Sequence, residues 1–496
     1  MDKRLPLPYP SRGMRGRSRR WLPLLAMTLV AGSGCAGRPV EPGGDGRALH
    51  VITVDPNGVP VHPTTYQELS AASFDQQLDA IERAMAGQRN LLLFVHGGLN
   101  NREAGQRHAD ALRRPMTDDG YYPLFLNWNS DLLDTTWQDL VHIRQGREAR
   151  ILGPLSFPLA ALIALGTGLV RTPMVWGHMI SSDLNGSGLY DFPGKTNSLA
   201  LQEEWRRLWE GRDPAAVAIE IGLDRTPPAA GAAAGVRYAA TLPSKLLVSP
   251  VIDGFGKGAW RNMLRRTQML FHREDEFDVR DKLASMPGPG RRRDLLVRGP
   301  QGAAHRLFDR LRAHLERHPE ARLTLVGHSM GTIVINRALR EFPDLPVRDV
   351  VYLAAACSID DFRTSVLPYL ARHDHVRFYN LTLHPSAEVR EWQAALLDLT
   401  PRGSLLVWID NFLSDPATTL DRTLGSWENL MQAAHVIPAA LRPRITLKAF
   451  GIDPAARPAL PGTHGGFTDP EVRFWCPEVW AVPGRPPRAP CARPHP

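Results

Sequence analysis

Ser329 lies in the stretch of this chain whose residue types and spacing are best suited to chemistry. Residues 323–326 predict a buried strand, Gly327-His328-Ser329-Met330-Gly331 follows at once, and residues 332–339 have helical spacing. A turn this tight strains the backbone of its central residue, and glycine two positions before and after it avoids collisions. We therefore expect the Ser329 hydroxyl at a strand end, facing a helix N-terminus whose free N–H groups can stabilise an oxyanion.

This turn matches the G-x-S-x-G nucleophile elbow, and here the chain resembles the alpha/beta-hydrolase superfamily, of the lipase and esterase type. A second match is His96-Gly97-Gly98, which follows the buried-strand pattern of residues 90–95. The resemblance implies that this loop supplies one backbone N–H to an oxyanion hole, from Gly98 or Leu99. Met330, directly after the serine, would supply the other.

The same resemblance implies a histidine base in the loop after the last core strand. His464 holds that position, between glycines that let the loop bend inward. His435 lies before the last strand and is the weaker candidate, and His328 is expected to face away from Ser329 and to be structural. The expected order along the chain is nucleophile, acid and histidine.

The acid is the least defined member of the expected triad. By resemblance it follows the strand predicted over residues 375–383, and the first carboxylate there is Glu388. Three rivals stay open, of which two lie in a later insertion and one follows the preceding strand: Asp410, Asp415 and Asp360.

Strand and helix patterns alternate through the parts of the chain that carry these motifs. They predict an α/β fold, a doubly wound and mostly parallel sheet like an alpha/beta-hydrolase core, with a large cap insertion and a second, smaller one. The expected core segments are residues 49–128, 303–383 and 445–470. The insertions cover residues 129–302 and 384–444, the second with an extra strand over 403–410, and a proline-rich tail covers 471–496.

Residues 1–35 resemble a bacterial lipoprotein signal peptide. A basic run and the apolar residues 21–31 precede Gly32-Ser33-Gly34-Cys35, and the resemblance implies lipidation of Cys35. Plain secretory cleavage and an uncleaved anchor stay open. Ala36 after the cysteine favours the outer membrane, with the protein facing the periplasm, and residues 36–48 are expected to be a flexible tether.

Residues 151–170 form a run of twenty residues without a charge, inside the first insertion. The length suits a transmembrane helix, but two prolines and three glycines weaken that interpretation. We favour an apolar cap over the active site that touches a bilayer. A spanning segment and a buried helix pair are the alternatives.

Composition narrows the possible partners. The formal charge of +8 lies mostly in the first 34 residues, so it does not indicate a nucleic-acid partner. Of the four cysteines, Cys357 is expected to be a buried apolar residue, while Cys476 and Cys491 could close a local disulfide in an oxidising periplasm. No His, Cys and carboxylate cluster has metal-ligand spacing, so neither a metal nor an organic cofactor is implied.

These observations predict a lipid-anchored serine hydrolase that cleaves carboxylic esters with apolar, lipid-like acyl groups. Two alternatives remain: a membrane-tethered scaffold that keeps the fold without turnover, and an acyltransferase that uses the same residues. The oligomeric state is open.

Overall fold

The structure is a computed structural model, and it describes residues 45–144, 147–149, 151–187, 218–221, 232–272, 301–391, 399–432, 434–450, 461–482 and 491. All of these belong to one compact unit, Glu41–Pro496. The expected signal peptide, Cys35 and residues 36–44 of the expected tether lie outside the described residues. Residues at the end of that tether form a short 3-10 helix, η2 (Asp45–Leu49).

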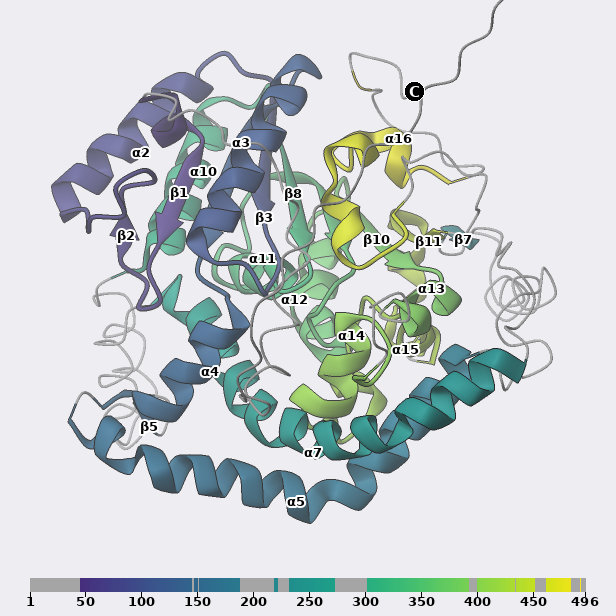
Figure 1. The fold of residues 1–496 in the computed structure, drawn as a ribbon. Coiled ribbons are helices and arrows are strands. Elements are labelled where there is room, and N and C mark those ends of the chain that lie inside the picture. The colour runs from purple at the N-terminus through teal and green to yellow at the C-terminus, as the bar shows by residue number, and fades with distance from the viewer. Residues whose placement is uncertain are drawn as a thin grey trace, which may run out of the picture. The chain divides into compact units, whose positions relative to one another are not determined.

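The core is an α/β arrangement around a mostly parallel sheet, as the alternation of patterns predicts (Figure 1). Within the described residues the sheet has nine strands in the order β2-β1-β4-β3-β8-β9-β10-β11-β7, and only β1 and β2 pair antiparallel. The strands are β1 (Val51–Val54), β2 (Pro60–Val61), β3 (Asn90–Val95), β4 (Tyr122–Trp128), β7 (Ala218–Ile221), β8 (Arg322–His328), β9 (Val347–Leu353), β10 (Arg377–Leu383) and β11 (Ile445–Phe450).

The strand order reverses between β3 and β8. From β3 the chain passes through α3 (Arg102–Asp118) to β4 on one side, whereas β8 continues to β9 on the other side. Parallel α/β sheets bind ligands in the crevice outside the strand ends at such a switch point. Val95 at the end of β3 is paired with Gly327 of β8, so the loop after β3 and the turn after β8 leave the sheet side by side.

Amphipathic helices connect the strands and bury their apolar faces in the core. Several begin with a polar side chain that accepts a hydrogen bond from the first turn, for example Ser358 from the Asp361 N–H at 3.0 Å. The helices of this group are α2 (Ala71–Met85), α3, α10 (Ala303–Arg317), α11 (Gly331–Glu341) and α12 (Ile359–Arg372).

The first insertion is not fully separate from the core, which corrects the expectation of a cap over residues 129–302. Its strand β7 pairs in parallel with β11 and extends the main sheet by one strand at its edge. The remaining elements are α4 (Leu132–Val141), the small hairpin β5 (Ile143–Arg144) and β6 (Arg147–Glu148), and two long helices, α5 (Leu152–Ser187) and α7 (Ala232–Met269). α5 and α7 pack along each other (Figure 1).

The extra strand expected over residues 403–410 is helical instead. Ser404 precedes α14 (Leu405–Trp408), and its Oγ accepts hydrogen bonds from the N–H groups of Leu406 at 3.1 Å and Val407 at 3.4 Å. A serine that satisfies the first free N–H groups stabilises a helix start, and this local signal overrides the apolar run that suggested a strand.

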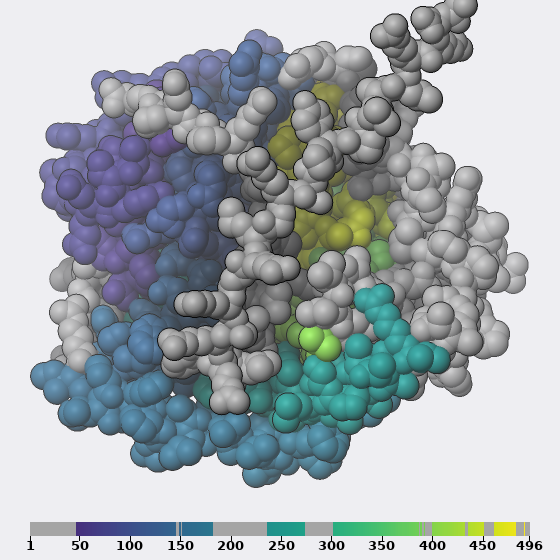
Figure 2. All heavy atoms as spheres, viewed as in Figure 1, coloured from purple at the N-terminus to yellow at the C-terminus, as the bar shows by residue number. Residues whose placement is uncertain are grey.

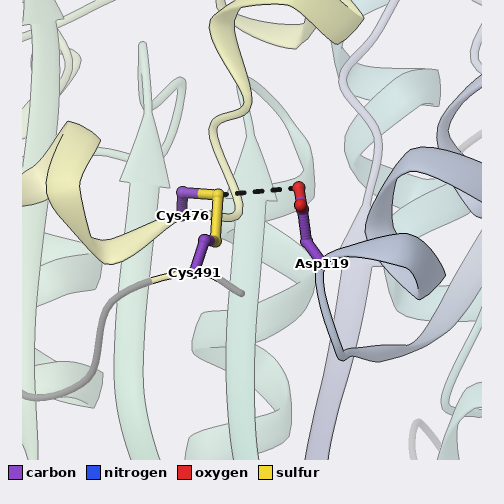
Figure 3. A group of neighbouring side chains, drawn as sticks. All are labelled: Asp119, Cys476 and Cys491. Atoms are coloured by element: carbon purple, nitrogen blue, oxygen red, sulfur yellow. Dashed lines mark hydrogen bonds between the residues drawn. A yellow bond between two sulfur atoms is a disulfide. The ribbon is translucent and has the colours of Figure 1, made fainter. Parts of the chain in front are cut away.

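The C-terminal segment is tied to the end of α3. Cys476 and Cys491 form a disulfide with a Cα–Cα distance of 5.5 Å, which confirms the expected pairing. Asp119 accepts hydrogen bonds from Arg473 Nη2 at 2.8 Å and from Trp475 Nε1 at 2.8 Å, and its Oδ2 lies 3.8 Å from Cys476 Sγ (Figure 3). Cys357 is buried and unbonded, as expected.

We predict that opening this disulfide destabilises the fold. A bridge between residues 15 apart removes loop-closure entropy from the unfolded chain, which corresponds to about 3 kcal/mol. Chemical unfolding with and without reductant should therefore show a lower free energy of unfolding in the reduced protein. Cys491→Ser should reproduce the loss and respond no further to reductant. An unchanged unfolding midpoint on reduction would contradict the prediction.

Candidate active site

The turn after β8 has the geometry that its glycines predict. Ser329 has a left-handed backbone, with φ of 50°. A Cβ on Gly331 would lie 2.0 Å from the Val95 carbonyl oxygen, and one on Gly327 would lie 2.9 Å from a methyl carbon of Ile335. Gly331 therefore excludes any side chain, Gly327 is tightly packed, and the turn brings the serine against the end of β3.

Hydrogen bonds hold the strained residue from both sides. The Ser329 N–H donates to the Leu353 carbonyl at 2.9 Å, and the Ser329 carbonyl accepts from the Ala356 N–H at 3.1 Å. A left-handed conformation at a non-glycine residue costs about 1 to 3 kcal/mol and persists only where the surroundings enforce it. The end of β9 provides that enforcement here.

The Ser329 side chain is buried and has no hydrogen-bond partner among the described residues. It is 1% exposed, and its Oγ makes no hydrogen bond within the described residues. The following residue, Met330, immediately precedes α11, and no hydrogen bond among the described residues uses its N–H. A buried hydroxyl that lacks a partner is unusual in a folded protein, and beside a helix N-terminus it points to a reacting group.

The loop after β3 lies directly against this turn. A Cβ on Gly97 would come within 2.7 Å of Ser329 Cβ, and one on Gly98 within 2.9 Å of Met330 Sδ. Of the two backbone N–H groups expected as oxyanion donors, those of Gly98 and Leu99, the second already has a partner. The Leu99 N–H donates to the Ser130 carbonyl at 2.9 Å. Leu99 is therefore occupied, and Gly98 is the donor that remains among the described residues.

His96 shapes this loop, a role that the sequence analysis missed. Its Nε2 accepts from the Trp128 N–H at 3.1 Å, so its Nδ1 carries the proton and donates to the Gly97 carbonyl at 2.8 Å. The ring also stacks on the Trp128 indole, with centroids 5.9 Å apart. Burial lowers the pKa of His96 to about 4, so the ring is neutral and the loop keeps this arrangement at physiological pH.

His464 lies beside the elbow, in the position that the resemblance implied. Its ring centroid is 5.1 Å from that of His328, the residue before Ser329, and its carbonyl oxygen is 3.0 Å from His328 Nε2. His328 thus holds the loop that carries His464, which we call the histidine loop, and this fits the structural role expected for His328. Burial, and then the nearby His328, lower the pKa of His464 well below the usual value, so the ring is neutral and able to accept a proton.

The serine and His464 are not hydrogen-bonded to each other in this conformation. Neither ring nitrogen of His464 has a hydrogen-bond partner within the described residues, and the same holds for Ser329 Oγ. Catalytic hydrogen bonds are often incomplete before substrate binds. His435, the weaker histidine candidate, lies on an exposed 3-10 turn, η5 (Ala434–Val436).

The expected acid, Glu388, is not the carboxylate that contacts His464. It lies on α13 (Pro385–Arg390), and its Oε1 accepts a hydrogen bond from Ser404 Oγ at 3.0 Å. Burial raises the pKa of Glu388 well above its usual value. The side chain therefore fastens α13 to the start of α14.

The three rival acids also have other partners. Asp410 accepts from Thr423 Oγ1 at 3.0 Å and from Asn429 Nδ2 at 2.6 Å, and is fully occupied in the second insertion. The other two form ion pairs: Asp415 with Lys257 and Arg171, and Asp360 with Arg363.

Glu391 is the carboxyl group that the structure brings to His464. The backbone N–H of His464 acts to lower its pKa, while its buried Oε2 has no hydrogen-bond partner within the described residues. Burial raises the pKa of Glu391 to about 7. It follows Glu388 by one helical turn, and choosing the first carboxylate after the strand missed it.

The site is closed by α7. A Cβ on Gly98 would lie 3.1 Å from the terminal methyl of Met263, which belongs to that helix. Residues 151–170, expected to cover the active site, instead lie along α7 in the N-terminal part of α5. The helix that reaches the loop at Gly98 is therefore α7, and α5 packs on α7.

Two groups of side chains elsewhere have ligand types that metals use. In the first, Cys476 and Cys491 are joined in the disulfide beside Asp119. In the second, Glu341 Oε1 lies 2.6 Å from His272 Nε2 and Oε2 lies 3.1 Å from His305 Nδ1, and Arg337 also pairs with this carboxylate. Burial opposes ionisation of Glu341, but these partners outweigh it and lower its pKa far below the usual range. The second group is therefore built as an ion-pair cluster.

No family model, no curated protein and no solved structure shows significant similarity to this chain.

The unusual pKa of Glu391 gives a stability prediction. Its carboxyl group titrates near 4.5 when unfolded and at about 7 in the fold. Between these values the folded protein keeps a proton that the unfolded chain has released, so stability falls as pH rises through that window. Glu391→Gln has no proton to lose, and its free energy of unfolding should improve relative to wild type from pH 4.5 to pH 7.

Chemical unfolding at a series of pH values measures this difference. An offset for Glu391→Gln that does not change with pH would show that this carboxyl is not buried as described.

Proposed function

We propose that this protein is a serine hydrolase that cleaves carboxylic esters through an acyl-enzyme. The observation that carries the proposal is the buried, unpartnered hydroxyl of Ser329 on a left-handed turn after the parallel strand β8. The loop of Gly97 and Gly98 lies against it, and a neutral imidazole, His464, lies against its neighbour His328. These are the parts that acyl transfer by serine needs.

In the proposed reaction Ser329 Oγ attacks the ester carbonyl carbon while His464 takes the hydroxyl proton. The N–H groups of Gly98 and Met330 stabilise the oxygen, which becomes negatively charged in the tetrahedral intermediate. When the intermediate collapses, the bond to the alcohol breaks and His464 returns the proton to the alcohol oxygen. A water molecule then attacks the acyl-enzyme by the same route and releases the acid.

Glu391 is the acid that we propose in place of Glu388. Its carboxyl group lies near the backbone N–H of His464, and its Oε2 has no hydrogen-bond partner among the described residues, so this oxygen is available to the imidazole. With a pKa of about 7, Glu391 is already ionised in part of the molecules at neutral pH. In these molecules its negative charge stabilises the imidazolium that forms when His464 takes the serine proton.

The surroundings of the site favour an apolar acyl group. Met263 and Met330 both contact the loop at Gly98, and flexible methionines adapt to irregular apolar ligands. Neither step of this chemistry requires a metal or an organic cofactor. With the lipoprotein-like signal and Cys35, the proposed setting is the bacterial cell envelope, facing the periplasm, with lipid-like esters as substrates.

The first test of this proposal is labelling with a fluorophosphonate. The full chain should gain the mass of a single adduct, and Ser329→Ala should gain none, because only an activated serine reacts with this reagent. Intact mass measurement with a thermal unfolding check on both proteins decides the outcome.

An adduct on Ser329→Ala would place the nucleophile elsewhere. A folded wild-type protein without an adduct would favour the inactive scaffold. If an adduct forms, product analysis with and without an added alcohol separates hydrolysis from acyl transfer, since a transferase forms a new ester.

The second test compares two glutamates one helical turn apart. Glu391→Gln should lower kcat for a p-nitrophenyl ester by about a hundredfold or more, because an amide cannot stabilise the imidazolium. Glu388→Gln, at a more fully buried position, should stay near wild type because Glu388 bonds to Ser404. The reverse result would restore Glu388 as the acid, and a loss in both variants would leave neither assignment standing.

A further inference from the structure

Exposed large apolar side chains are concentrated on one helix. In the described part of the chain, most of those on the surface belong to α5 or to its neighbours α4 and α7. On α5 and the residue before it they are Ile151, Leu152, Leu155, Leu159, Leu162, Ile163, Leu165, Leu169, Val170, Met174 and Trp176. We call the exposed side of this helix the α5 outer face. Soluble proteins rarely leave so long an apolar surface in water.

The outer face is free of charge over most of its length. No charged residue occurs from 151 to 170, and Arg171, the next one, turns toward the protein, where its Nε lies 3.2 Å from Asp253 Oδ2. In Figure 2, α5 (blue) borders the lower edge of the molecule, and no other coloured element lies beyond it. A docking protein would meet few polar groups to bond with, whereas lipid tails need none.

The other side of α5 is fastened to α7 at close range. A Cβ on Gly168 would lie 2.1 Å from the Pro250 carbonyl oxygen, and one on Gly254 would lie 2.3 Å from the Ala164 carbonyl oxygen, so the two backbones touch. Further along, Trp176 Nε1 donates to the Leu246 carbonyl at 2.8 Å. α5 is therefore one wall of the folded protein.

This attachment argues against a spanning helix, although Leu152–Ser181 is long and apolar enough to cross a membrane. To span, α5 would have to carry α7 with it, including the buried charges of Lys245 and Asp253. Charged groups are costly in the hydrocarbon layer, and two of them on one neighbouring helix disfavour an upright position. A helix lying in the plane of the membrane surface requires no such burial.

We propose that the α5 outer face binds a lipid bilayer, with the helix lying parallel to the membrane plane in the interfacial layer. Indoles mark both ends of the apolar face: Trp137 of α4, 58% exposed, packs against Phe157 near the start, and Trp176, 38% exposed, lies toward the end. Tryptophan favours the level of the lipid head groups. The proposal concerns where the protein sits and does not depend on the reaction proposed above.

The chain before the described residues favours a bilayer over a second copy of the protein. The apolar residues 21–31 and Cys35 precede the first described residue, Asp45, by a short segment. Ten residues span at most about 35 Å, so an N-terminus inserted in or lipidated at a membrane would keep the fold within reach of its surface. A second attachment then needs only modest affinity of its own.

The test measures the depth of three positions on the outer face by spin labelling. Leu155, Leu162 and Leu169 are each separately replaced by cysteine in the full chain carrying Cys35→Ser, so that no lipid is attached. Cys357 is buried and the other two cysteines are bonded, so the label reports one site. Gln76→Cys on the exposed side of α2 serves as the matched control.

With phosphatidylethanolamine and phosphatidylglycerol vesicles, oxygen should relax the three outer-face labels more, and a water-soluble nickel complex less, than without vesicles. The three depths should agree, and the Gln76 label should not change. An upright helix would instead separate the first and last positions by about 21 Å of depth, which would overturn the in-plane orientation. Labels that stay accessible to nickel, or that broaden each other through contact between copies, would overturn the bilayer proposal.

A partition measurement adds a second criterion. Leu162→Asp should weaken binding to the same vesicles by about tenfold or more, because it removes one buried leucine and adds a charge. Gln76→Asp should bind like the parent chain. Binding driven by apolar contact should persist at high salt, so a complete loss in salt would show electrostatic adsorption instead and contradict the proposal.

Discussion

The left-handed backbone of Ser329 is the constraint on which the rest of the site depends. Leu353 at the end of β9 and Ala356 just beyond it hold Ser329 by two hydrogen bonds, and Gly331 lets the turn press against the end of β3. Those contacts fix the register of the three central strands and bring the loop at Gly97 against the serine. A register shift in the β3–β8 pair or in the β8–β9 pair would remove the support for the strained residue. The geometry of the site therefore depends on the correct pairing of these strands.

The polar side-chain atoms of the candidate site are buried and lack hydrogen-bond partners in the described part of the chain, and this burial determines their protonation states. Ser329 Oγ, both ring nitrogens of His464 and Glu391 Oε2 lack partners within the described residues, and burial keeps the imidazole neutral and the carboxyl group partly protonated. Each unpaired atom costs stability in the free protein. Asp410 and Glu341 avoid this cost, because their oxygens have hydrogen-bond or ion-pair partners.

Features with local causes could be predicted from the sequence, and features with tertiary causes could not. The elbow, the buried strands and the fold class follow from residue spacing around Ser329. Glu391 could not be chosen over Glu388, because helix α13 decides which side chain faces Ser404 and which faces the histidine loop. The strand β7 was likewise missed, since its partner β11 lies more than two hundred residues later. The helix after Ser404 could have been predicted from the capping serine, but the apolar residues that follow it suggested a strand.

The candidate site combines segments that lie far apart in the sequence. His464 comes from a loop close to the C-terminus, where His108 Nε2 also lies 3.0 Å from the Thr468 carbonyl oxygen and Asp119 pairs with Arg473. Contacts between residues so far apart in sequence form late in folding. In the proposed function, Ser329 therefore gains its base only when the segment around His464 has packed against the elbow. Reactivity of the serine would then report the completion of these long-range contacts.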